Sequence, residues 1–294
     1  MSNVDQQDSW TVGRLLDWTA QHLAKKGAEY PRLDAEVLLA HALGCRRIDL
    51  YAGRHEEIAA DELRERFREL IRRRLEGCPV AYLVGRKEFF SLEFEVGPGV
   101  LIPRPETEFV VMECLARARG QAGVRIIDIG TGSGCIPVTL ARHLPDADIT
   151  AVDISDDALA FARRNAARHG VAKRIRFLAG DLFAPVAGES FDFVLSNPPY
   201  IAREDIPQLP VGVRQYEPHV ALGGGPGGYA VLERLLGEAP RVLKPGGYLI
   251  VEIGAPQEQP VRERFAARAG YDLAPTVYDF ARHPRVLCAR WAFK

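Results

Sequence analysis

The feature that most constrains the fold of this chain is a regular alternation, from residue 124 onward, of short β-rich runs with longer helical stretches. The runs are dominated by Val, Ile, Leu and Phe, and they occupy residues 124–129, 149–152, 175–178, 191–195 and 248–253. Helical patterns at 156–168 and 230–243 stand between them. A strand that is followed by a helix and then by another strand is typical of a parallel, doubly wound sheet.

The carboxyl-terminal segment has a different pattern. Residues 271–277 and 285–291 are two further β-rich runs with only a loop between them. Two strands joined in this way can pair only as an antiparallel hairpin. The predicted fold is therefore α/β: a doubly wound, mostly parallel, seven-stranded sheet with an antiparallel carboxyl-terminal hairpin at one edge.

The amino-terminal part, residues 11–76, is predicted to be helical. Gly27 and Gly44 are helix-ending signals for the first and second predicted helices. The apolar positions of the three predicted helices are, in chain order, Val12, Leu15, Leu16 and Leu23; Leu33, Val37, Leu38 and Ala42; and Leu63, Phe67, Leu70, Ile71 and Leu75. Six arginines and three glutamates are interleaved along the third helix, which is more typical of a solvated face than of a nucleic-acid surface.

Residues 87–102 are predicted to form a β-hairpin between the helical and the α/β parts. Residues 87–96 alternate apolar and polar side chains, Gly97-Pro98-Gly99 is a turn signal, and residues 100–102 are apolar. The predicted division is a helical domain at 1–77, a linking hairpin at 78–105 and an α/β domain at 106–294.

Charge and cysteine content exclude several classes of function. The formal net charge of the 294 residues is −1, so no whole-molecule basic field gathers nucleic acid. The five cysteines include no C-x-x-C pair, and the histidines show no ligand spacing, so neither a disulfide framework nor a metal site is expected. Neither a signal peptide nor a membrane-spanning run is apparent. These features favour a reducing, cytoplasmic setting.

A glycine-rich turn follows the first parallel strand. The chain reads Asp128-Ile129-Gly130-Thr131-Gly132-Ser133-Gly134 and then enters an apolar helix. Such a turn brings backbone N–H groups and a helix amino end close to a ligand. A dinucleotide fingerprint requires its third glycine at position 135, which is Cys135. The carboxylate of Asp128 also suits a cationic ligand, such as the amino-acid end of S-adenosylmethionine, better than a pyrophosphate.

Acidic residues end the next two strands. Asp153 stands where a carboxylate can accept both hydroxyls of a ribose. Asp181 can accept from an adenine amino group while Leu182 lies against the ring. Each has an ordinary alternative, as a helix cap or a turn residue. Because the carboxyl ends of parallel strands share one edge of the sheet, a common nucleoside ligand is the better explanation.

The fourth strand ends at Asn197-Pro198-Pro199-Tyr200. Two prolines stop the strand and hold the chain rigid beyond it. The Asn197 side-chain oxygen and the Pro198 carbonyl can each accept one N–H of a planar NH2 group, and the Tyr200 ring can lie against its plane. Taken alone, the four residues can also be an ordinary turn.

With these motifs, the chain resembles the S-adenosylmethionine-dependent methyltransferases that modify planar nitrogens. Over nearly its whole length it is similar to the release-factor glutamine N5-methyltransferases. The match extends to residues 101–108 (Leu-Ile-Pro-Arg-Pro-Glu-Thr-Glu), 217–222 and 243–247. It departs from the family at Leu182, where an aromatic residue is common, and at Gly227, where an acidic residue is usual.

The resemblance implies a Rossmann-like enzyme that methylates the side-chain N5 of a glutamine, that of a Gly-Gly-Gln motif, in a peptide chain release factor. It implies that the helical domain recognises the substrate, that Asn197, Pro198 and Tyr200 are catalytic, and that these residues hold the glutamine together with Pro199. It implies cofactor contacts from Gly130, Thr131, Gly132, Ser133, Gly134, Asp153, Asp181, Leu182 and Asn197. A cytoplasmic monomer, with no membrane partner and no direct nucleic-acid substrate, is expected.

Two other functions share part of this pattern. The same four residues serve nucleic-acid N-methyltransferases that act on adenine N6 or guanine N2, although a duplex-DNA enzyme needs a target-reading domain and basic surroundings. A non-catalytic adaptor that binds the cofactor is the second alternative.

Overall fold

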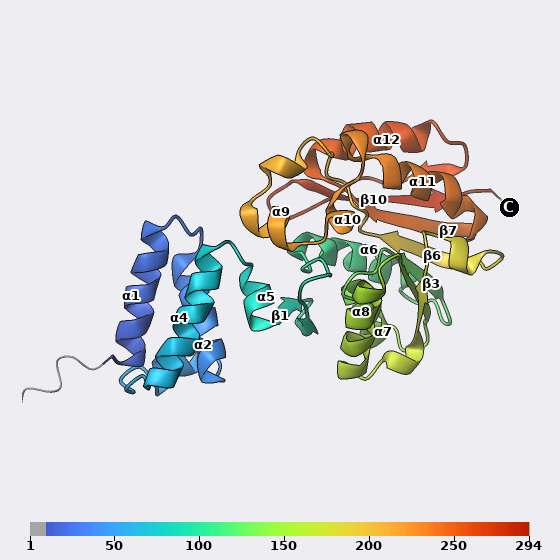
Figure 1. Cartoon of the computed structure of the whole chain (residues 1–294). Helices are drawn as coiled ribbons and strands as arrows, with labels where there is room; N and C mark the ends of the chain where they lie inside the picture. The colour runs from blue at the N-terminus through green and yellow to red at the C-terminus, as the bar shows by residue number, and fades with distance from the viewer. Residues whose placement is uncertain (1–9, 294) are drawn as a thin grey trace, which may run out of the picture. The chain divides into compact units, whose positions relative to one another are not determined.

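A computed structural model describes residues 10–293, which form two compact units (Figure 1). One unit comprises the chain up to Gly85 together with Val211–Tyr216. The other comprises Arg86–Pro210 and the chain from Glu217 onward. The first unit is therefore discontinuous in sequence, which the predicted domain boundaries did not include.

Apart from an isolated β-bridge between Thr11 and Ile58, the regular structure in the described part of the first unit is helical. Its helices are α1 (Val12–Lys25), α2 (Pro31–Leu43), α3 (Asp49–Ala52), α4 (Asp61–Leu75), α5 (Val80–Val84) and α9 (Val211–Tyr216). Thr11 caps α1 by accepting from the Arg14 amide, and Gly44 ends α2 in the left-handed conformation with φ of 65°. Helix α1 ends at Lys25, two residues before the predicted Gly27, which has φ of 81°, and α2 ends at the predicted Gly44.

The predicted buried faces are confirmed for α1 and corrected for α2. All four apolar positions predicted for α1 are buried. In α2, however, Leu33 is exposed, and the buried face runs through Ala35, Leu38 and Leu39. Leu75 at the end of α4 is also exposed. Apolar side chains near helix ends extend beyond the packed core, so periodicity alone does not reveal their exposure.

Three arginines of α4 have acidic partners on the same helix, at its carboxyl-terminal cap or on α2. Arg64 pairs with Asp61, Arg72 pairs with Glu69 and Glu76, and Arg74 pairs with Asp34 at 2.8 Å. These contacts agree with a solvated, charge-paired helix face.

The hairpin prediction was wrong in its placement. The two strands are β1 (Arg86–Phe89) and β2 (Leu92–Glu95), and Phe89 pairs with Leu92. Both turn residues, Phe90 and Ser91, have positive φ, of 50° and 58°. A two-residue turn of this kind normally has Asn or Gly, so the alternating run contained no visible turn signal. Residues 100–102 are not a strand.

The second unit contains the predicted sheet. Its strands are β3 (Arg125–Ile129), β4 (Asp148–Asp153), β5 (Ile175–Ala179), β6 (Phe191–Ser196), β7 (Leu243–Glu252), β8 (Tyr271–Leu273), β9 (Val277–Tyr278) and β10 (Pro284–Trp291). The order is β5-β4-β3-β6-β7-β10-β8, with β9 paired to β10. The strands β3 to β7 are parallel, and β10 is antiparallel to β7.

The carboxyl-terminal hairpin is antiparallel as predicted, but it differs in detail. The segment predicted as one strand divides into β8 and β9, and both pair with β10. Strand β10 therefore lies inside the sheet, between β7 and β8, and only its partners lie at the edge.

Helices cover both faces of this sheet (Figure 1). Alternate residues of β3 enter different cores: Ile126 packs with α6 (Glu108–Ala118) and α7 (Cys135–His143), whereas Ile127 packs with α11 (Ala230–Glu238) and α12 (Glu258–Ala266). Burial on both faces accounts for the nearly continuous apolar strands. Among the described residues, no helix is long and apolar enough to cross a bilayer.

Candidate active site

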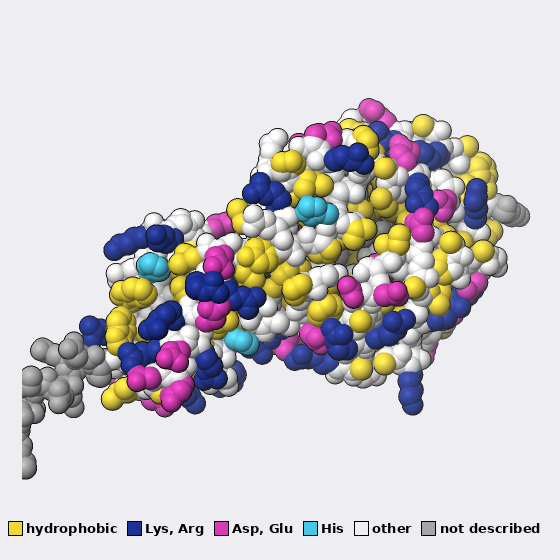
Figure 2. Space-filling view, viewed as in Figure 1, with side chains coloured by type: hydrophobic (Ala, Val, Ile, Leu, Met, Phe, Trp, Pro, Cys, Tyr) yellow, Lys and Arg dark blue, Asp and Glu magenta, His cyan; other side chains and the backbone are white. Residues whose placement is uncertain are grey.

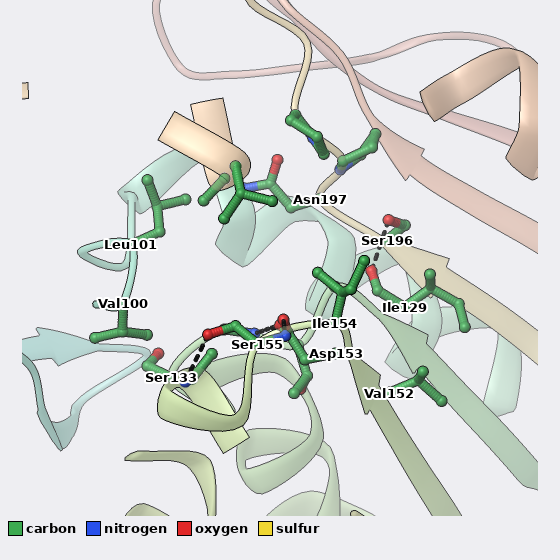
Figure 3. Close-up of a pocket in the computed structure, with 18 of the residues that line it drawn as sticks. Val100, Leu101, Ile129, Ser133, Val152, Asp153, Ile154, Ser155, Ser196 and Asn197 are labelled. Atoms are coloured by element: carbon green, nitrogen blue, oxygen red, sulfur yellow. Dashed lines mark hydrogen bonds between the residues drawn. The ribbon is translucent and has the colours of Figure 1, made fainter. Parts of the chain in front are cut away.

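A cavity of about 290 Å³ lies in the second unit at the carboxyl ends of β3, β4, β5 and β6 (Figure 3). Strands β4 and β5 follow β3 on one side of it, and the next strand, β6, lies on the other side of β3. Ligands of open α/β sheets bind beside such a switch in the strand order. Of the predicted site residues, those that line the cavity are Gly130, Thr131, Gly132, Ser133, Asp153, Asp181, Leu182, Asn197, Pro198 and Pro199. Gly134 and Tyr200 are not among the lining residues.

The glycine-rich turn is held to β4 by its backbone. The amides of Gly130 and Thr131 both donate to the Val152 carbonyl, and Gly132 has a φ of 55°. Gly134 precedes α7 with φ of 78°, and a Cβ at that position would lie 3.0 Å from the Ala162 Cβ. The requirement for glycine at position 134 is therefore one of conformation and helix packing, because a side chain there would collide with α8 (Asp156–Arg168).

Asp153 is oriented by two backbone amides. Its Oδ2 accepts from Gly132 N at 2.8 Å, and its Oδ1 accepts from Ser155 N at 2.9 Å (Figure 3). Burial raises the pKa of the Asp153 carboxyl, although these hydrogen bonds act in the opposite direction. Because each carboxylate oxygen can accept more than one hydrogen bond, both can still accept from a diol.

Asp128 is fully buried beneath the glycine-rich turn, and neither of its oxygens has a hydrogen-bond partner. The hydroxyls of Thr131 and Ser133 are likewise buried without a partner. Burial raises the pKa of Asp128 to about 7, and the nearby Thr131 hydroxyl acts in the opposite direction. A buried carboxyl without partners is costly, and a cationic group with N–H donors nearby would offset that cost. These orphaned oxygens fit a ligand with an ammonium group.

The acidic residue that follows β5, unlike Asp128 and Asp153, is paired with an arginine. Both oxygens of Asp181 accept from the guanidinium of Arg234, each at 3.0 Å, and both side chains are about half exposed. Leu182 is buried with a φ of 48°, an uncommon conformation for a branched side chain. Asp181 and Leu182 both line the cavity, as does Arg234.

At the fourth strand end, Asn197 is held by a hydrogen-bonded chain of side chains. Its Nδ2 donates to Thr107 Oγ1 at 3.0 Å, and Thr107 Oγ1 donates to Glu252 Oε2 at 2.6 Å. Tyr200 donates its hydroxyl to Glu252 Oε1 at 3.3 Å. The Tyr200 hydroxyl is therefore directed at the end of β7.

The glycine-rich loop at 223–228 lies against the backbone that follows Asn197. Gly224 N donates to the Ile201 carbonyl at 2.8 Å, and a Cβ on Gly224 would lie 2.6 Å from the Pro199 oxygen. Only glycine permits this approach. At Gly227, the amide donates to Glu204 Oε1 at 3.2 Å, so an acidic side chain from elsewhere in the chain contacts the loop.

Two of the sequence segments that carry the resemblance meet at the rim of the cavity. Arg104 donates to Glu217 Oε1 at 2.5 Å, and the Ile102 amide donates to Glu217 Oε2 at 3.4 Å. The Glu217 side chain is almost completely buried, while Arg104 is about a third exposed and lines the cavity. A buried carboxylate that is paired in this way fixes the guanidinium at the cavity.

Sequence reasoning missed several residues. Val100, Leu101 and Ile154 supply apolar lining, and Ile154 remains largely exposed even though it follows a buried strand (Figure 3). Thr107 and Glu252 were not singled out as site residues. A signal for Glu252 was present, since it is a charged residue inside the apolar run 248–253. Among the described residues, no group of three or more His, Cys, Asp or Glu could hold a metal.

Comparison with known proteins gives matches in both units. The family described as "PrmC N-terminal domain" matches residues 14–85, and the family described as "Methyltransferase domain" matches residues 121–271. A curated relative from Rhodopirellula baltica, named release factor glutamine methyltransferase, is 44% identical over 293 residues, which are 98% of this chain and 98% of the relative.

A second curated relative and one solved structure are also similar to this chain. A relative of the same name from Salmonella typhimurium is 40% identical over 266 residues, which are 90% of this chain and 94% of the relative. Among solved structures, a methyltransferase from Pyrococcus furiosus is similar with a TM-score of 0.52 and 20% identity, over 70% of this chain and 92% of that chain. The structural match supports the Rossmann-like methyltransferase fold.

Proposed function

This chain belongs to the family of release factor glutamine methyltransferases, and from that premise we propose that it methylates a glutamine in a peptide chain release factor. The reaction moves a methyl group from S-adenosylmethionine to the side-chain N5, and the proposed target is the glutamine of a Gly-Gly-Gln motif. Near full-length identity of 38–44% to relatives that share one name supports this reaction. The observation that carries the proposal at the level of the site is Asn197, which lines the same cavity as the glycine-rich turn and Asp153.

The residues of the cavity fit S-adenosylmethionine, which supplies a methyl group on a sulfonium centre when it is bound. The unpartnered hydroxyls of Thr131 and Ser133, which line the cavity, suit the ammonium group of its amino-acid end, as does the buried carboxyl of Asp128 beside the lining residue Ile129. Asp153 would accept from the ribose hydroxyls, and Asp181 with Leu182 would contact the adenine. The remaining proposed contacts come from the backbone of Gly130, Gly132 and Gly134 and from Asn197.

On the acceptor side, Asn197 and Pro198 would bind the glutamine amide. An amide nitrogen is a poor nucleophile because its lone pair is delocalised into the carbonyl. If Asn197 Oδ1 and the Pro198 carbonyl accept its two N–H groups, they stabilise the positive charge that grows on nitrogen during methyl transfer. They also aim the nitrogen along the line of displacement, which can lower the barrier by several kcal/mol.

Pro199 and Tyr200 complete the acceptor site in this proposal. Pro199 lines the cavity and keeps the backbone rigid, while the Tyr200 ring would stack on the amide plane. The Tyr200 hydroxyl is hydrogen-bonded to Glu252, so the ring and not the hydroxyl would contact the amide. The proton leaves nitrogen after transfer, to water or a nearby carbonyl.

We further propose that the helical part at 1–77 recognises the release factor and that the parts at 78–105 and 106–294 are the link and the methyltransferase domain. Lysine and arginine side chains are interspersed with acidic ones over the face shown in Figure 2. Together with a net charge of −1, this distribution supports a protein substrate over nucleic acid. The enzyme is proposed to act as a monomer in the cytoplasm.

The test is incubation of the protein with methyl-labelled S-adenosylmethionine and, separately, with a release factor, a ribosomal protein, tRNA and DNA. We expect label only in the release factor, and mass spectrometry is expected to place one methyl group on the glutamine side chain. Label in tRNA or DNA would support the nucleic-acid alternative. Binding of the cofactor without labelling of any acceptor would support the adaptor.

A further inference from the structure

A buried carboxyl lies behind the proposed acceptor site, and the reaction described above does not use it. Glu252 ends β7 and is about 1% exposed. Ser196 of β6 pairs with Val251 of β7 in parallel register, so the next residues along the two strands are Asn197 and Glu252. The side chain of Thr107 lies between them, bonded to both.

The hydrogen-bonding capacity of these three groups determines the direction of the bonds. A carboxylate can only accept, and a threonine hydroxyl has a single proton. The 2.6 Å contact between Thr107 Oγ1 and Glu252 Oε2 therefore uses the threonine proton. Thr107 can then only accept from Asn197, and the group that donates over 3.0 Å must be the NH2 of the amide.

We propose that Glu252 and Thr107 are positioning residues that set the polarity of the Asn197 amide, so that its oxygen, and not its nitrogen, is presented to the acceptor NH2. This inference rests on the proposed function, because it concerns the group that would bind the glutamine. An Asn side chain can exchange its O and N by a half-turn about its last bond. The hydrogen-bonded relay from Asn197 through Thr107 to Glu252 strongly favours one of these two orientations.

The second oxygen of the same carboxyl positions Tyr200. Glu252 Oε1 accepts from the Tyr200 hydroxyl at 3.3 Å. Burial and the negative charge of Glu252 raise the pKa of Tyr200, so this hydroxyl remains a donor at neutral pH. One buried carboxyl thus holds the first and last residues of the Asn197–Tyr200 segment.

Several groups near Glu252 shift the pKa of its carboxyl. Burial raises the pKa of Glu252 to about 7, and the neighbouring negative charge of Glu106 acts in the same direction. The hydrogen bonds from Thr107 and Tyr200 and the positive charge of Arg285 oppose this shift. Arg285 is itself paired with Asp279 at 2.7 Å and Glu106 at 3.5 Å. Burial raises the pKa of the Cys135 thiol, and the negative charges of Asp128 and Glu252 add to this shift.

Protonation of Glu252 reverses the relay. The carboxylic acid then donates to Thr107, Thr107 donates to the Asn197 oxygen, and the amide turns its NH2 toward the acceptor. Two NH2 groups that face each other cannot hydrogen-bond. The ionised carboxyl is therefore the active form, and kcat is expected to fall as the pH decreases through the pKa of Glu252 in the enzyme–substrate complex.

The variants Thr107→Val, Thr107→Ser and Glu252→Gln test the proposal in the full chain, with a release factor as substrate. Valine keeps the shape of threonine without the hydroxyl, and serine keeps the hydroxyl. We expect Thr107→Val to lower kcat about 10- to 100-fold, as for loss of a hydrogen bond to a charged group. Thr107→Ser is expected to stay within about threefold of the wild type, because it preserves the bonds.

Two further measurements separate positioning from a general structural effect. The affinity for S-adenosylhomocysteine, measured by calorimetry, is expected to change less than about threefold in Thr107→Val, because the relay lies on the acceptor side. The acidic limb of the wild-type kcat profile is expected to disappear in Glu252→Gln. The matched control is Thr139→Val, which also removes a buried threonine hydroxyl. The Thr139 hydroxyl donates to the Cys135 carbonyl at 2.6 Å. This variant should keep kcat within about twofold of the wild type.

The proposal would be overturned by wild-type kcat in Thr107→Val, by an equal loss in Thr107→Ser and Thr107→Val, or by an unchanged acidic limb in Glu252→Gln. If Thr107→Val fails to fold, the serine variant and Glu252→Gln still decide the matter. Failure of the proposed function is distinguishable, because the wild-type enzyme itself would then leave the release-factor glutamine unlabelled.

Discussion

The two sides of the cavity are held in place by different kinds of bonds. On the side proposed for the cofactor, the Asp153 carboxylate is oriented by backbone amides 21 and 2 residues away in the sequence. On the side proposed for the acceptor, Asn197 is oriented by Thr107, which is 90 residues away in the sequence. Thr107 is in turn bonded to Glu252, and these two residues are 145 positions apart. Bonds from backbone amides hold one side, and bonds between side chains from distant segments hold the other.

The two sides should therefore respond differently to amino-acid substitutions. Backbone amides are present whatever the side chains are, so the cofactor side tolerates changes in residues next to the turn as long as its conformation is kept. The acceptor side depends on the identity of three side chains at once. Substitutions on the first side should therefore change cofactor affinity, and those on the second side should change kcat.

The largest effect is expected for Asn197→Ala. Loss of the amide oxygen removes a hydrogen bond that strengthens as charge develops, so kcat is expected to fall about a thousandfold. Cofactor affinity should change far less, because the other contacts lie at different strand ends. A radiolabelled methyl assay and calorimetry with S-adenosylhomocysteine measure the two effects. Near-normal turnover would show that Asn197 does not take part in the reaction. It would also contradict the assignment of kcat effects to the acceptor side.

Asp153→Ala is expected to have the opposite pattern. Removing a carboxylate that would accept from both ribose hydroxyls should weaken cofactor binding about 10- to 100-fold, with a smaller effect on kcat at saturating cofactor. Calorimetry measures the affinity, and Asp156→Ala, which changes an exposed carboxylate three residues later in α8, is the control. An unchanged affinity would show that Asp153 only stabilises the glycine-rich turn.

Asp128→Asn tests the buried, unpartnered carboxyl through stability. Because burial raises the pKa of Asp128 from 3.8 to about 7, its contribution to stability is fully present below about pH 3.8 and is lost as the pH rises through 7. The asparagine variant has no such loss, so its melting temperature relative to the wild type should rise between pH 5 and pH 8. Thermal unfolding without cofactor measures the difference.

The same variant should bind the cofactor more weakly, because a neutral amide cannot pair with an ammonium group. A difference in melting temperature that stays constant with pH would mean that Asp128 does not titrate in this range. Stronger stability with weaker binding would show that this carboxyl is kept for the ligand at the expense of the fold.

The smallest effect is expected for Leu182→Phe, which restores the aromatic residue common in the family. A ring stacked on adenine should tighten cofactor binding about three- to tenfold and leave kcat nearly unchanged. Calorimetry with S-adenosylhomocysteine measures the change. Weaker binding would indicate that the positive φ of Leu182 and its buried position leave no room for a ring.

Much of the fold could be predicted because the signals were local. The parallel strands, the glycine at the end of α2 and the apolar face of α1 all follow from periodicity and backbone preference. The hairpin was misplaced because Phe90 and Ser91 adopt positive φ without a glycine or asparagine to indicate it. The exposure of Leu33 depends on what packs against α2, which periodicity does not contain.

The amino-acid sequence by itself determined the α/β architecture and brought Gly132, Asp153 and Asn197 to one edge of the sheet, because parallel strands end on the same side. Only the tertiary structure decided how Asn197 is oriented. Thr107, Asn197 and Glu252 come from three distant segments, and no local preference relates them. Their partnership arises from the register of β6 beside β7 and from the burial that leaves each polar group a single way to be satisfied.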